Sequence, residues 1–246
     1  MRKEQMEYRQ IDVPVVPPAP EIPSWVWGNP AAKNGHINNA EGKGYPLKRL
    51  FDIVVVLAGL IISSPLWLVF ALAIKLEDRG PVFFTQERWG KGKSKIRVYK
   101  FRTMVPNAVE KFGHIQAREN DPRVTRVGRF LRATSLDEMP QLLNILRGDM
   151  SWVGPRALPI DEIQAQGEGT DLPDEAIPGF EARARLRPGL TGIAQIFAPR
   201  DILRQQKYQY DAIYANSQSL WLDLRLIFLS LWITFRARWE ARGNKL

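Results

Sequence analysis

The pattern of hydrophobic and polar positions is dominated by one uncharged apolar run, residues 53–74. Its length reaches the roughly 20 residues that a helix needs to cross the hydrocarbon core of a bilayer. Ser63, Ser64 and Pro65 interrupt the run near its middle. A proline kinks a helix, because it lacks an N–H and its ring collides with the carbonyl four residues earlier. The pattern therefore predicts a membrane helix that is broken at Ser64 and Pro65.

The charges around this run indicate how the helix sits in the membrane. The loops of a spanning protein usually carry their excess of lysine and arginine on one side only. Here basic residues stand before and after the run, at Lys43, Lys48, Arg49, Lys75, Arg79 and Arg88. A helix that enters one leaflet, bends and returns to the same face satisfies both the kink and the charges. We therefore expect a re-entrant membrane helix over residues 45–76 with both ends in the cytoplasm. A straight single-span anchor that tolerates its proline is the alternative.

Two terminal segments flank the remaining chain. Residues 1–44 are rich in proline, which predicts an extended, largely unpacked and flexible tail. Near the other end, residues 226–235 are uncharged but too few to cross a bilayer. Tryptophans alternate with arginines around them, so residues 219–246 are predicted to form an interfacial amphipathic helix. A buried core helix is the alternative for this segment.

Between these segments, residues 77–218 are expected to form one cytoplasmic catalytic domain. Residues 82–86 and 96–101 read as two strands joined by a turn over residues 90–93. With helical patterns elsewhere, the expected fold class is α/β, mostly helical with a small β-hairpin, in a monotopic membrane protein.

Composition narrows the chemistry that this domain can perform. The net charge of +9 permits anionic lipid, nucleic acid or a phosphorylated substrate as partner. The chain has no cysteine, which excludes disulfides, thiolate metal sites and cysteine nucleophiles. Its two histidines, His36 and His114, are too isolated to predict a zinc site or a histidine relay.

The densest chemical information lies in residues 121–156. Four arginines recur there at every third position, Arg123, Arg126, Arg129 and Arg132. Arginine suits phosphate, because its planar fork donates two parallel hydrogen bonds to an oxyanion. A solvated face explains the first three equally well. Arg132 is different, because it stands just before the next element begins.

That element is predicted to be a helix that begins near Leu136 or Asp137, because Pro140 is tolerated only in a first turn. Gly148 is expected to end it. Its expected apolar face consists of Met139, Leu142, Leu143 and Leu146.

The first turn of this helix has two interpretations. The spacing from Ser135 to Glu138 matches a capping box, in which the carboxylate only satisfies backbone amides. In the functional interpretation, a helix N-terminus favours a carboxylate and bound phosphate. An ionised Asp137 would then attack phosphorus while the adjacent Glu138 binds a divalent cation such as magnesium.

Several motifs, taken in order, resemble those of one family. A basic pair and an apolar helix broken by SSP precede GPVFFTQERWGKG, YKFRTM, the block of residues 121–156, RPGLTGIAQI and SLWLDLRLI. This order resembles the bacterial sugar transferases, the monotopic phosphoglycosyl transferases, over about residues 45–230. The resemblance implies transfer of a sugar phosphate from a nucleotide diphosphate sugar, usually UDP-linked, to polyprenyl (undecaprenyl) phosphate, with release of UMP. It also implies a re-entrant membrane helix, Mg²⁺ and an Asp-Glu dyad at the active site.

By position, the resemblance implies that Asp137 and Glu138 are this dyad. Asp137 would be the covalent nucleophile, which splits one difficult displacement into two easier ones. Glu138 would support the metal ion or orient the attacked phosphate. Arg132, Arg156 and Arg200 match arginines that the family places around the diphosphate, where fixed cations stabilise developing charge.

Lys100 and Arg102 of the YKFRTM motif are further expected substrate contacts, with an exposed strand surface as the alternative. Two departures from the family pattern stand out. Ala157 replaces the proline that usually follows the arginine of the GPR motif, so the local backbone is expected to be less rigid. The acidic, glycine-rich segment of residues 161–180 has no counterpart in the family, and it reads as a substrate-specific loop or a neutral insertion.

The expected protein is thus a transferase at the cytoplasmic face of a bacterial inner membrane, with polyprenyl phosphate, a nucleotide sugar and membrane lipid as partners. It would perform the first membrane step in making an exopolysaccharide, capsule, O-antigen or glycoprotein glycan. A Mg²⁺-dependent hydrolase on the same dyad is one alternative. A membrane-anchored nucleic-acid-binding module is another, although the chain lacks a recognisable helix-turn-helix or aromatic platform, so no nucleic acid is expected. The sequence leaves the sugar and the oligomeric state open.

Overall fold

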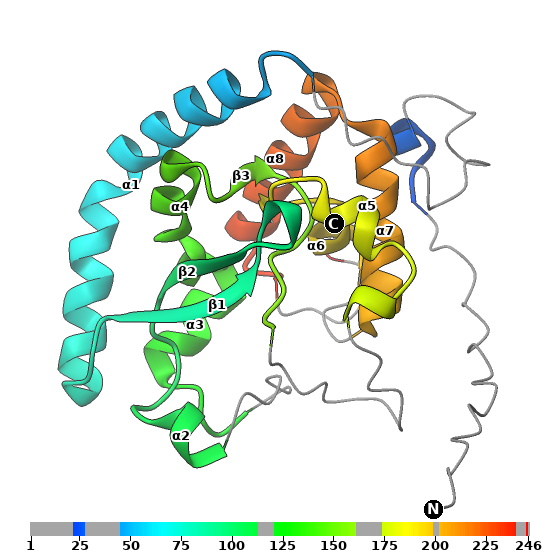
Figure 1. Ribbon diagram of the computed structural model, residues 1–246. Coiled ribbons are helices and arrows are strands. Elements are labelled where there is room, and N and C mark those ends of the chain that lie inside the picture. The colour runs from blue at the N-terminus through cyan, green and yellow to red at the C-terminus, as the bar shows by residue number, and fades with distance from the viewer. Residues whose placement is uncertain are drawn as a thin grey trace, which may run out of the picture.

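The computed structural model describes residues 22–27, 45–112, 121–160, 174–198, 202–239 and Lys245. The described part is mostly helical with two small pairs of strands (Figure 1). In chain order the elements are η1 (Ser24–Trp27), α1 (Lys48–Asp78), β1 (Phe83–Trp89), η4 (Lys91–Lys93), β2 (Lys95–Phe101), α2 (Ala108–Phe112), α3 (Arg126–Thr134), η5 (Leu136–Glu138), α4 (Gln141–Arg147), β3 (Ser151–Val153), η6 (Asp174–Ala176), α5 (Phe180–Ala184), β4 (Gly189–Thr191), α6 (Ile193–Phe197), α7 (Arg204–Ser217) and α8 (Leu220–Phe235).

The predicted β-hairpin is confirmed. Strands β1 and β2 pair antiparallel, with Phe83 opposite Phe101 and Trp89 opposite Lys95. The turn between them contains the short helix η4, where Gly92 has a φ of 67°, a value that glycine adopts without strain. β1 runs three residues beyond the predicted strand, to Trp89, so it also carries Arg88.

Helix α1 is continuous through its proline. It spans 31 residues with Pro65 inside, and Figure 1 shows it bending around the left side of the molecule. Pro65 has no N–H to donate to the carbonyl of Ile61, four residues earlier. The Ser64 hydroxyl donates to that carbonyl instead, at 2.9 Å. The predicted break is therefore a bend whose released carbonyl is satisfied by a neighbouring side chain.

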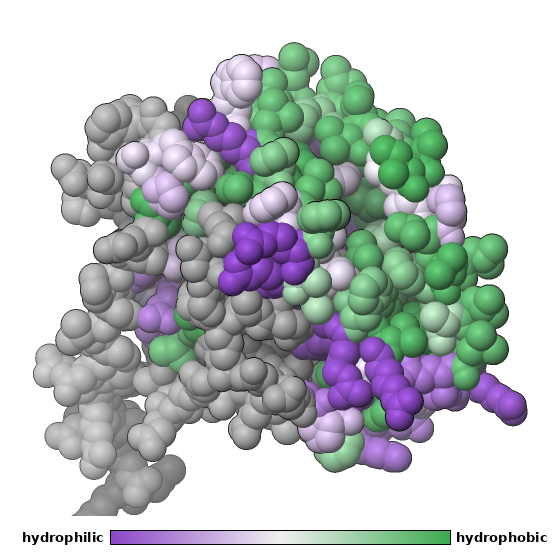
Figure 2. Space-filling view, turned by 180° about the vertical axis from the view of Figure 1, so that it is seen from behind, coloured by the Kyte–Doolittle hydropathy of each residue, from purple (hydrophilic) through white to green (hydrophobic). Residues whose placement is uncertain are grey.

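Most of α1 is exposed although it is apolar. It is the only helix among the described residues that is long and apolar enough to cross a membrane, and little of that stretch is buried. Figure 2 shows the resulting hydrophobic band over the side of the molecule that α1 occupies. The exposed apolar residues of α1 are Leu50, Val54, Leu57, Ile61, Ile62, Leu66, Leu68, Val69, Leu72 and Leu76. So large an exposed apolar surface is typical of a membrane-binding face.

The N-terminal end of α1 is attached to the domain through α8. Lys48 forms an ion pair with Asp223 at 2.5 Å, and the Tyr45 hydroxyl donates to the same carboxylate at 2.9 Å. Asp52 accepts a hydrogen bond from the backbone N–H of Trp152 at 3.1 Å. The first two turns of α1 thus contact both α8 and the start of β3.

The C-terminal end of α1 is attached to the same domain. The Glu77 carboxylate accepts hydrogen bonds from the first two backbone N–H groups of α3, those of Arg126 and Val127, at 2.7 and 3.1 Å. Asp78 pairs with the guanidinium of Arg102. Both ends of the apolar helix are therefore fastened to one globular body.

The core behind α1 consists of several apolar clusters. One lies between α1, β2 and α4, around Val56, Val98 and Ile145. The largest joins α6, α7 and α8 to the short parallel pair β3–β4. The backbone just after β3 lies very close to β4, because a Cβ on Gly189 would come within 2.1 Å of the backbone N of Gly154. This close approach fixes the start of the loop that carries Arg156.

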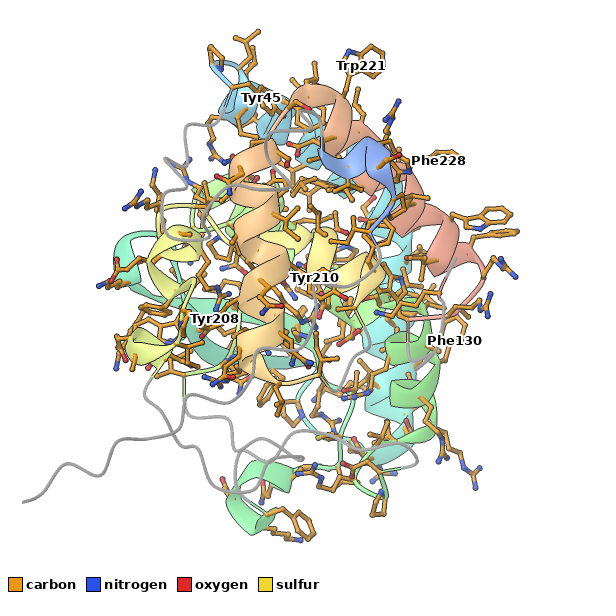
Figure 3. All side chains as sticks on the ribbon, turned by 90° about the vertical axis from the view of Figure 1, so that its right-hand side faces the viewer. Tyr45, Phe130, Tyr208, Tyr210, Trp221 and Phe228 are labelled. Carbon is orange, nitrogen blue, oxygen red and sulfur yellow. The ribbon has the colours of Figure 1, made fainter. Side chains whose placement is uncertain are left out.

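Helix α8 has one face on the core and one outside. Leu226 and Ile233 are fully buried, whereas Trp221 and Phe228 point away from the domain (Figure 3). The exposed face also carries Leu231, Trp232 and Phe235. This division fits the predicted amphipathic helix over residues 220–235, but the helix ends at Phe235, and residues 236–239 of the predicted segment are not helical.

One stretch of the N-terminal segment differs from the expected unpacked tail. Ile22 and Val26 are buried in the largest core cluster, and Trp25 contacts Phe197 edge-on. These apolar side chains pack because α6 and α7 offer them an apolar surface. The other residues of the predicted tail lie outside the described part of the chain.

Candidate active site

The two predicted catalytic carboxylates lie on a short 3-10 turn instead of an α-helical N-terminus. Asp137 and Glu138 belong to η5, and α4 begins only at Gln141, after Pro140. The predicted helix start near Leu136 is therefore wrong by about one turn. Ser135 has a φ of 58° and its side chain makes no capping hydrogen bond in this turn, so the capping-box interpretation is also wrong.

The predicted apolar face of α4 is only partly correct. Met139 and Leu142 are buried as expected, and Ile145 is fully buried. Leu143 and Leu146 are instead 40% and 39% exposed. The reason is that α4 lies beside α1, whose outward face is itself apolar, so an apolar residue outside α4 continues that surface (Figure 1).

A polar pocket opens over this turn. Asp137 and Glu138 are 7% and 6% exposed, so both carboxylates are buried in its floor. The lining residues are Arg132, Ser135, Asp137, Glu138, Arg156, Ala194, Gln195, Ala198, Lys207, Trp239 and Lys245. Five of them are lysine, arginine or tryptophan residues, and these come from α3, the loop after β3, α7 and the C-terminal segment. Tertiary packing therefore builds the wall around the two acids.

Cations hold Glu138 in its ionised form. Lys100 Nζ lies 2.6 Å and Arg156 Nη2 3.1 Å from Glu138 Oε1. Burial alone would raise the pKa of Glu138, but the charges of Lys100, Arg156 and Arg88 outweigh it and hold the pKa well below its usual range. Burial in turn lowers the pKa of Lys100, against the charges of Glu138 and Asp137. Glu138 is thus a permanent anion at neutral pH.

Asp137 stands beside the same group of cations. Lys100 Nζ is 3.8 Å from its Oδ2, and Arg132 lies within electrostatic reach of it. Asp137 also lines the pocket, so its carboxylate can meet an electrophile that binds there. The geometry therefore suits Asp137 as a nucleophile and Glu138 as its fixed anionic neighbour.

The pocket offers a small donor set for a metal ion. Among the described residues no group of three or more histidine, aspartate or glutamate side chains converges. Asp137 and Glu138 face the same pocket, and both cations that contact Glu138 use Oε1, so Oε2 is the oxygen that can meet a metal ion. One or two carboxylates completed by substrate phosphates and water are a usual environment for Mg²⁺. The residues therefore fit this ion.

Of the other residues predicted to contact the substrate, the structure brings some to the dyad and places others elsewhere. Arg132, Arg156 and Lys100 gather at the dyad. Arg102 instead pairs with Asp78 and donates to the carbonyl of Met104 at 3.1 Å, which is the environment of a structural residue. Arg200 lies outside the described residues.

The remaining arginines of the predicted series do not line the pocket. Arg123 pairs with Asp121 at 2.6 Å, whereas Arg126 and Arg129 are exposed on α3. The solvated interpretation fits these last two.

Sequence reasoning missed several residues of the site, among them Arg88, Gln195, Lys207, Trp239 and Lys245. One signal was available for Arg88. In the hairpin register Lys100 of β2 lies opposite Phe84 of β1. Side chains two or four residues apart on one strand share a face, so Arg88, four residues after Phe84 on β1, lies on the same face of the hairpin as Lys100. The others come from α6, α7 and the C-terminal segment, and no local pattern links them to the dyad.

Comparison with known proteins decides the family. The family model described as "Bacterial sugar transferase" matches residues 44–237. The chain belongs to the bacterial sugar transferase family. This family match contains the bent apolar helix, the hairpin, the dyad and the three cations whose charges act on Glu138, namely Lys100, Arg156 and Arg88.

Three curated relatives illustrate the likeness. The exopolysaccharide production protein PSS of Rhizobium leguminosarum bv. phaseoli is 42% identical over 74% of this chain and 92% of its own length. The UDP-glucose:undecaprenyl-phosphate glucose-1-phosphate transferases of Klebsiella pneumoniae and Caulobacter vibrioides are 43% and 44% identical over 76% and 73% of this chain. The aligned region spans 40% and 66% of those two proteins, so this sugar transferase corresponds to only part of them.

Proposed function

We propose that this sugar transferase moves a sugar 1-phosphate from a UDP-sugar to undecaprenyl phosphate, giving undecaprenyl-diphospho-sugar and UMP. The observation that carries the proposal is the pair of buried carboxylates, Asp137 and Glu138, facing one pocket within a cluster of cations. A diphosphate donor is an anion that such a pocket can bind, and the names of the relatives print both substrates. UDP-glucose is the first donor to test.

The reaction proceeds in two displacements on one phosphorus. In the first, an Asp137 carboxylate oxygen attacks the phosphorus that bears the sugar, and the bond from that phosphorus to the UMP oxygen breaks with its electron pair. In the second, a phosphate oxygen of undecaprenyl phosphate attacks the same phosphorus and the bond to Asp137 breaks. The carboxylate is then restored, and no oxidant or reductant is needed.

The cations of the pocket perform the electrostatic part of this reaction. Arg132 and Arg156 would bind the diphosphate oxygens, on which negative charge moves as the bond to UMP breaks. Lys100 keeps Glu138 ionised and oriented through their contact at 2.6 Å. When bound by Asp137 and Glu138, Mg²⁺ would supply charge neutralisation of the diphosphate.

The acceptor is a lipid phosphate, so the pocket has to work at the membrane surface. The exposed apolar faces of α1 and α8 supply a binding surface for lipid (Figures 2 and 3). Both ends of α1 are fastened to one globular body, by Lys48 to Asp223 and by Asp78 to Arg102. A folded domain lies on one side of a bilayer, which supports a re-entrant helix. We place the domain at the cytoplasmic face of a bacterial inner membrane, where UDP-sugars are available.

The covalent step gives the sharpest test. Incubation of purified enzyme with donor alone should release UMP in a burst equal to the amount of enzyme and leave a phosphosugar adduct detectable by intact mass. Asp137→Asn keeps the size of the side chain but removes the anion, so it should show no burst, no adduct and no turnover. Glu138→Gln is the matched variant, which should lose most activity but retain the nucleophile. Full turnover by Asp137→Asn would overturn the mechanism.

The acceptor decides between a transferase and the hydrolase alternative. Undecaprenyl phosphate added after the burst should start steady turnover with a labelled lipid product. Release of free sugar phosphate at the same rate with and without the lipid would identify a hydrolase instead.

A further inference from the structure

A buried ion pair lies behind Arg156, outside the pocket. Arg183 of α5 and Asp211 of α7 approach to 3.1 Å, and their side chains are 4% and 2% exposed. Neither residue belongs to the pocket lining. Charged residues this deeply buried are expensive and are kept only when paired, so the pair calls for a role.

Both members of this pair contact the backbone of Arg156. Arg183 Nη2 donates to the Arg156 carbonyl oxygen, and the Arg156 backbone N–H donates to the Asp211 carboxylate. The two polar groups of one residue's main chain are thus fixed by one ion pair. The Arg156 side chain then extends to Glu138 Oε1 at 3.1 Å.

We infer that Arg183 and Asp211 are positioning residues that hold the Arg156 guanidinium at the dyad. This inference rests on the proposed function, because it concerns the group expected to bind the transferred diphosphate. Arg156 follows the short strand β3, and its only strand pairing among the described residues is one isolated parallel bridge to Gly189. A backbone fixed at both its donor and its acceptor leaves the side chain fewer orientations to search. Preorganised cations are effective because they need not reorganise during the reaction.

A matched control exists in the same region. Arg204 and Asp174 form a second buried pair, 8% and 6% exposed, with a contact at 2.5 Å. Arg204 also donates to a backbone carbonyl after β3, that of Pro159, at 2.8 Å. This pair has similar burial and involves the same helix α7, but the backbone carbonyl that it holds is that of Pro159, not that of Arg156. Asp174→Asn therefore reports the structural cost of removing such a carboxylate.

The test is a double-mutant cycle on kcat/KM, with the UDP-sugar that supports turnover and undecaprenyl phosphate. Arg156→Ala should lower kcat/KM by about 100-fold or more, and Asp211→Asn by about tenfold or more. If Asp211 acts through Arg156, the double variant should be no slower than Arg156→Ala. Arg183→Lys keeps a cation for Asp211 but lacks the second nitrogen for the Arg156 carbonyl, and it should give a similar non-additive loss. If Asp211→Asn does not fold, the cycle of Arg183→Lys with Arg156→Ala tests the same inference.

Each pattern of results has one meaning. Losses that multiply in the double variant, or a loss in Asp174→Asn that equals that in Asp211→Asn, would overturn the positioning role and leave the proposed function intact. Normal turnover by Arg156→Ala would overturn both the role of Arg156 and the positioning pair. Failure of the proposed function appears separately, as absent UMP release by the wild-type enzyme.

Discussion

Straightening α1 should send its N-terminal end across the membrane in part of the molecules. The double substitution Ser64→Ala/Pro65→Ala restores the helical N–H and removes the hydroxyl that now donates to the Ile61 carbonyl. As a straight helix at about 1.5 Å per residue, residues 53–74 would be about 33 Å long. The hydrocarbon core of a bilayer is about 30 Å thick. The straightened segment is therefore long enough to span it.

The structure sets the size of the opposing effects. A proline inside a helix costs about 3 kcal/mol, so its removal favours the straight helix by about that amount. Crossing would break the ion pair of Lys48 with Asp223, whose side chain is fully buried, at a cost of about 3–5 kcal/mol. Crossing would also break the hydrogen bonds of Tyr45 with Asp223 and of Trp152 with Asp52, so we expect the spanning topology in a minority of the molecules. Adding Asp223→Asn removes the anion, leaves every N-terminal cation in place and should increase the spanning fraction.

Cysteine labelling can measure these fractions, because the chain contains no cysteine. Gly42→Cys and Gly243→Cys are introduced singly and treated in intact cells with a membrane-impermeant maleimide. In the otherwise wild-type protein neither should react from the periplasm. In the straightened protein Gly42→Cys should react in part, whereas Gly243→Cys should stay protected. Periplasmic labelling of Gly42→Cys without the other substitutions would refute the re-entrant helix, and complete protection in the triple variant would refute the energetic argument.

Three further outcomes are expected. EDTA should stop both UMP release and transfer, and Mg²⁺ should restore them; full activity after exhaustive chelation would exclude the metal. Arg102→Ala breaks the pair with Asp78, whose side chain is 22% exposed, so the free energy of unfolding should fall by about 1–3 kcal/mol while kcat of the folded fraction persists; a selective loss of kcat would return Arg102 to the substrate site. Burial raises the pKa of Asp211 to about 6 from 3.8, although Arg183 opposes it. The folded protein then holds this proton more tightly than the unfolded chain, so the Asp211 contribution to stability should decrease by about 2 kcal/mol from pH 4 to pH 7. Thermal unfolding of Asp211→Asn should lack this component, and an unchanged pH profile would contradict the expectation.

Local features allowed several parts of the fold to be predicted from the sequence. The length of the apolar run, its proline and the glycines of the hairpin turn each act within a few residues. They specified the helix of residues 48–78 with its interruption at Pro65 and the pairing of β1 with β2. The family resemblance added Asp137 and Glu138, because their motif is contiguous in the chain.

The sequence predicted the ends of the helices less well than it predicted which helices and strands form. The order of residues around Pro140 permits a helix from Leu136, but the structure has a 3-10 turn followed by α4. The exposure of Leu143 also depends on context, since an apolar residue faces outward only where the neighbouring surface is apolar too. Propensity and periodicity do not contain that information.

The assembly of the site was decided by tertiary structure alone. Lys100 contacts Glu138 across 38 residues of sequence, whereas Arg102, two residues later, turns to Asp78. Arg183 and Asp211 meet at Arg156 from two different helices. Ion pairs form where packing brings opposite charges together in a buried space, and their strength depends on that burial. A sequence gives the charges, but the packing of the core chooses which of them become partners.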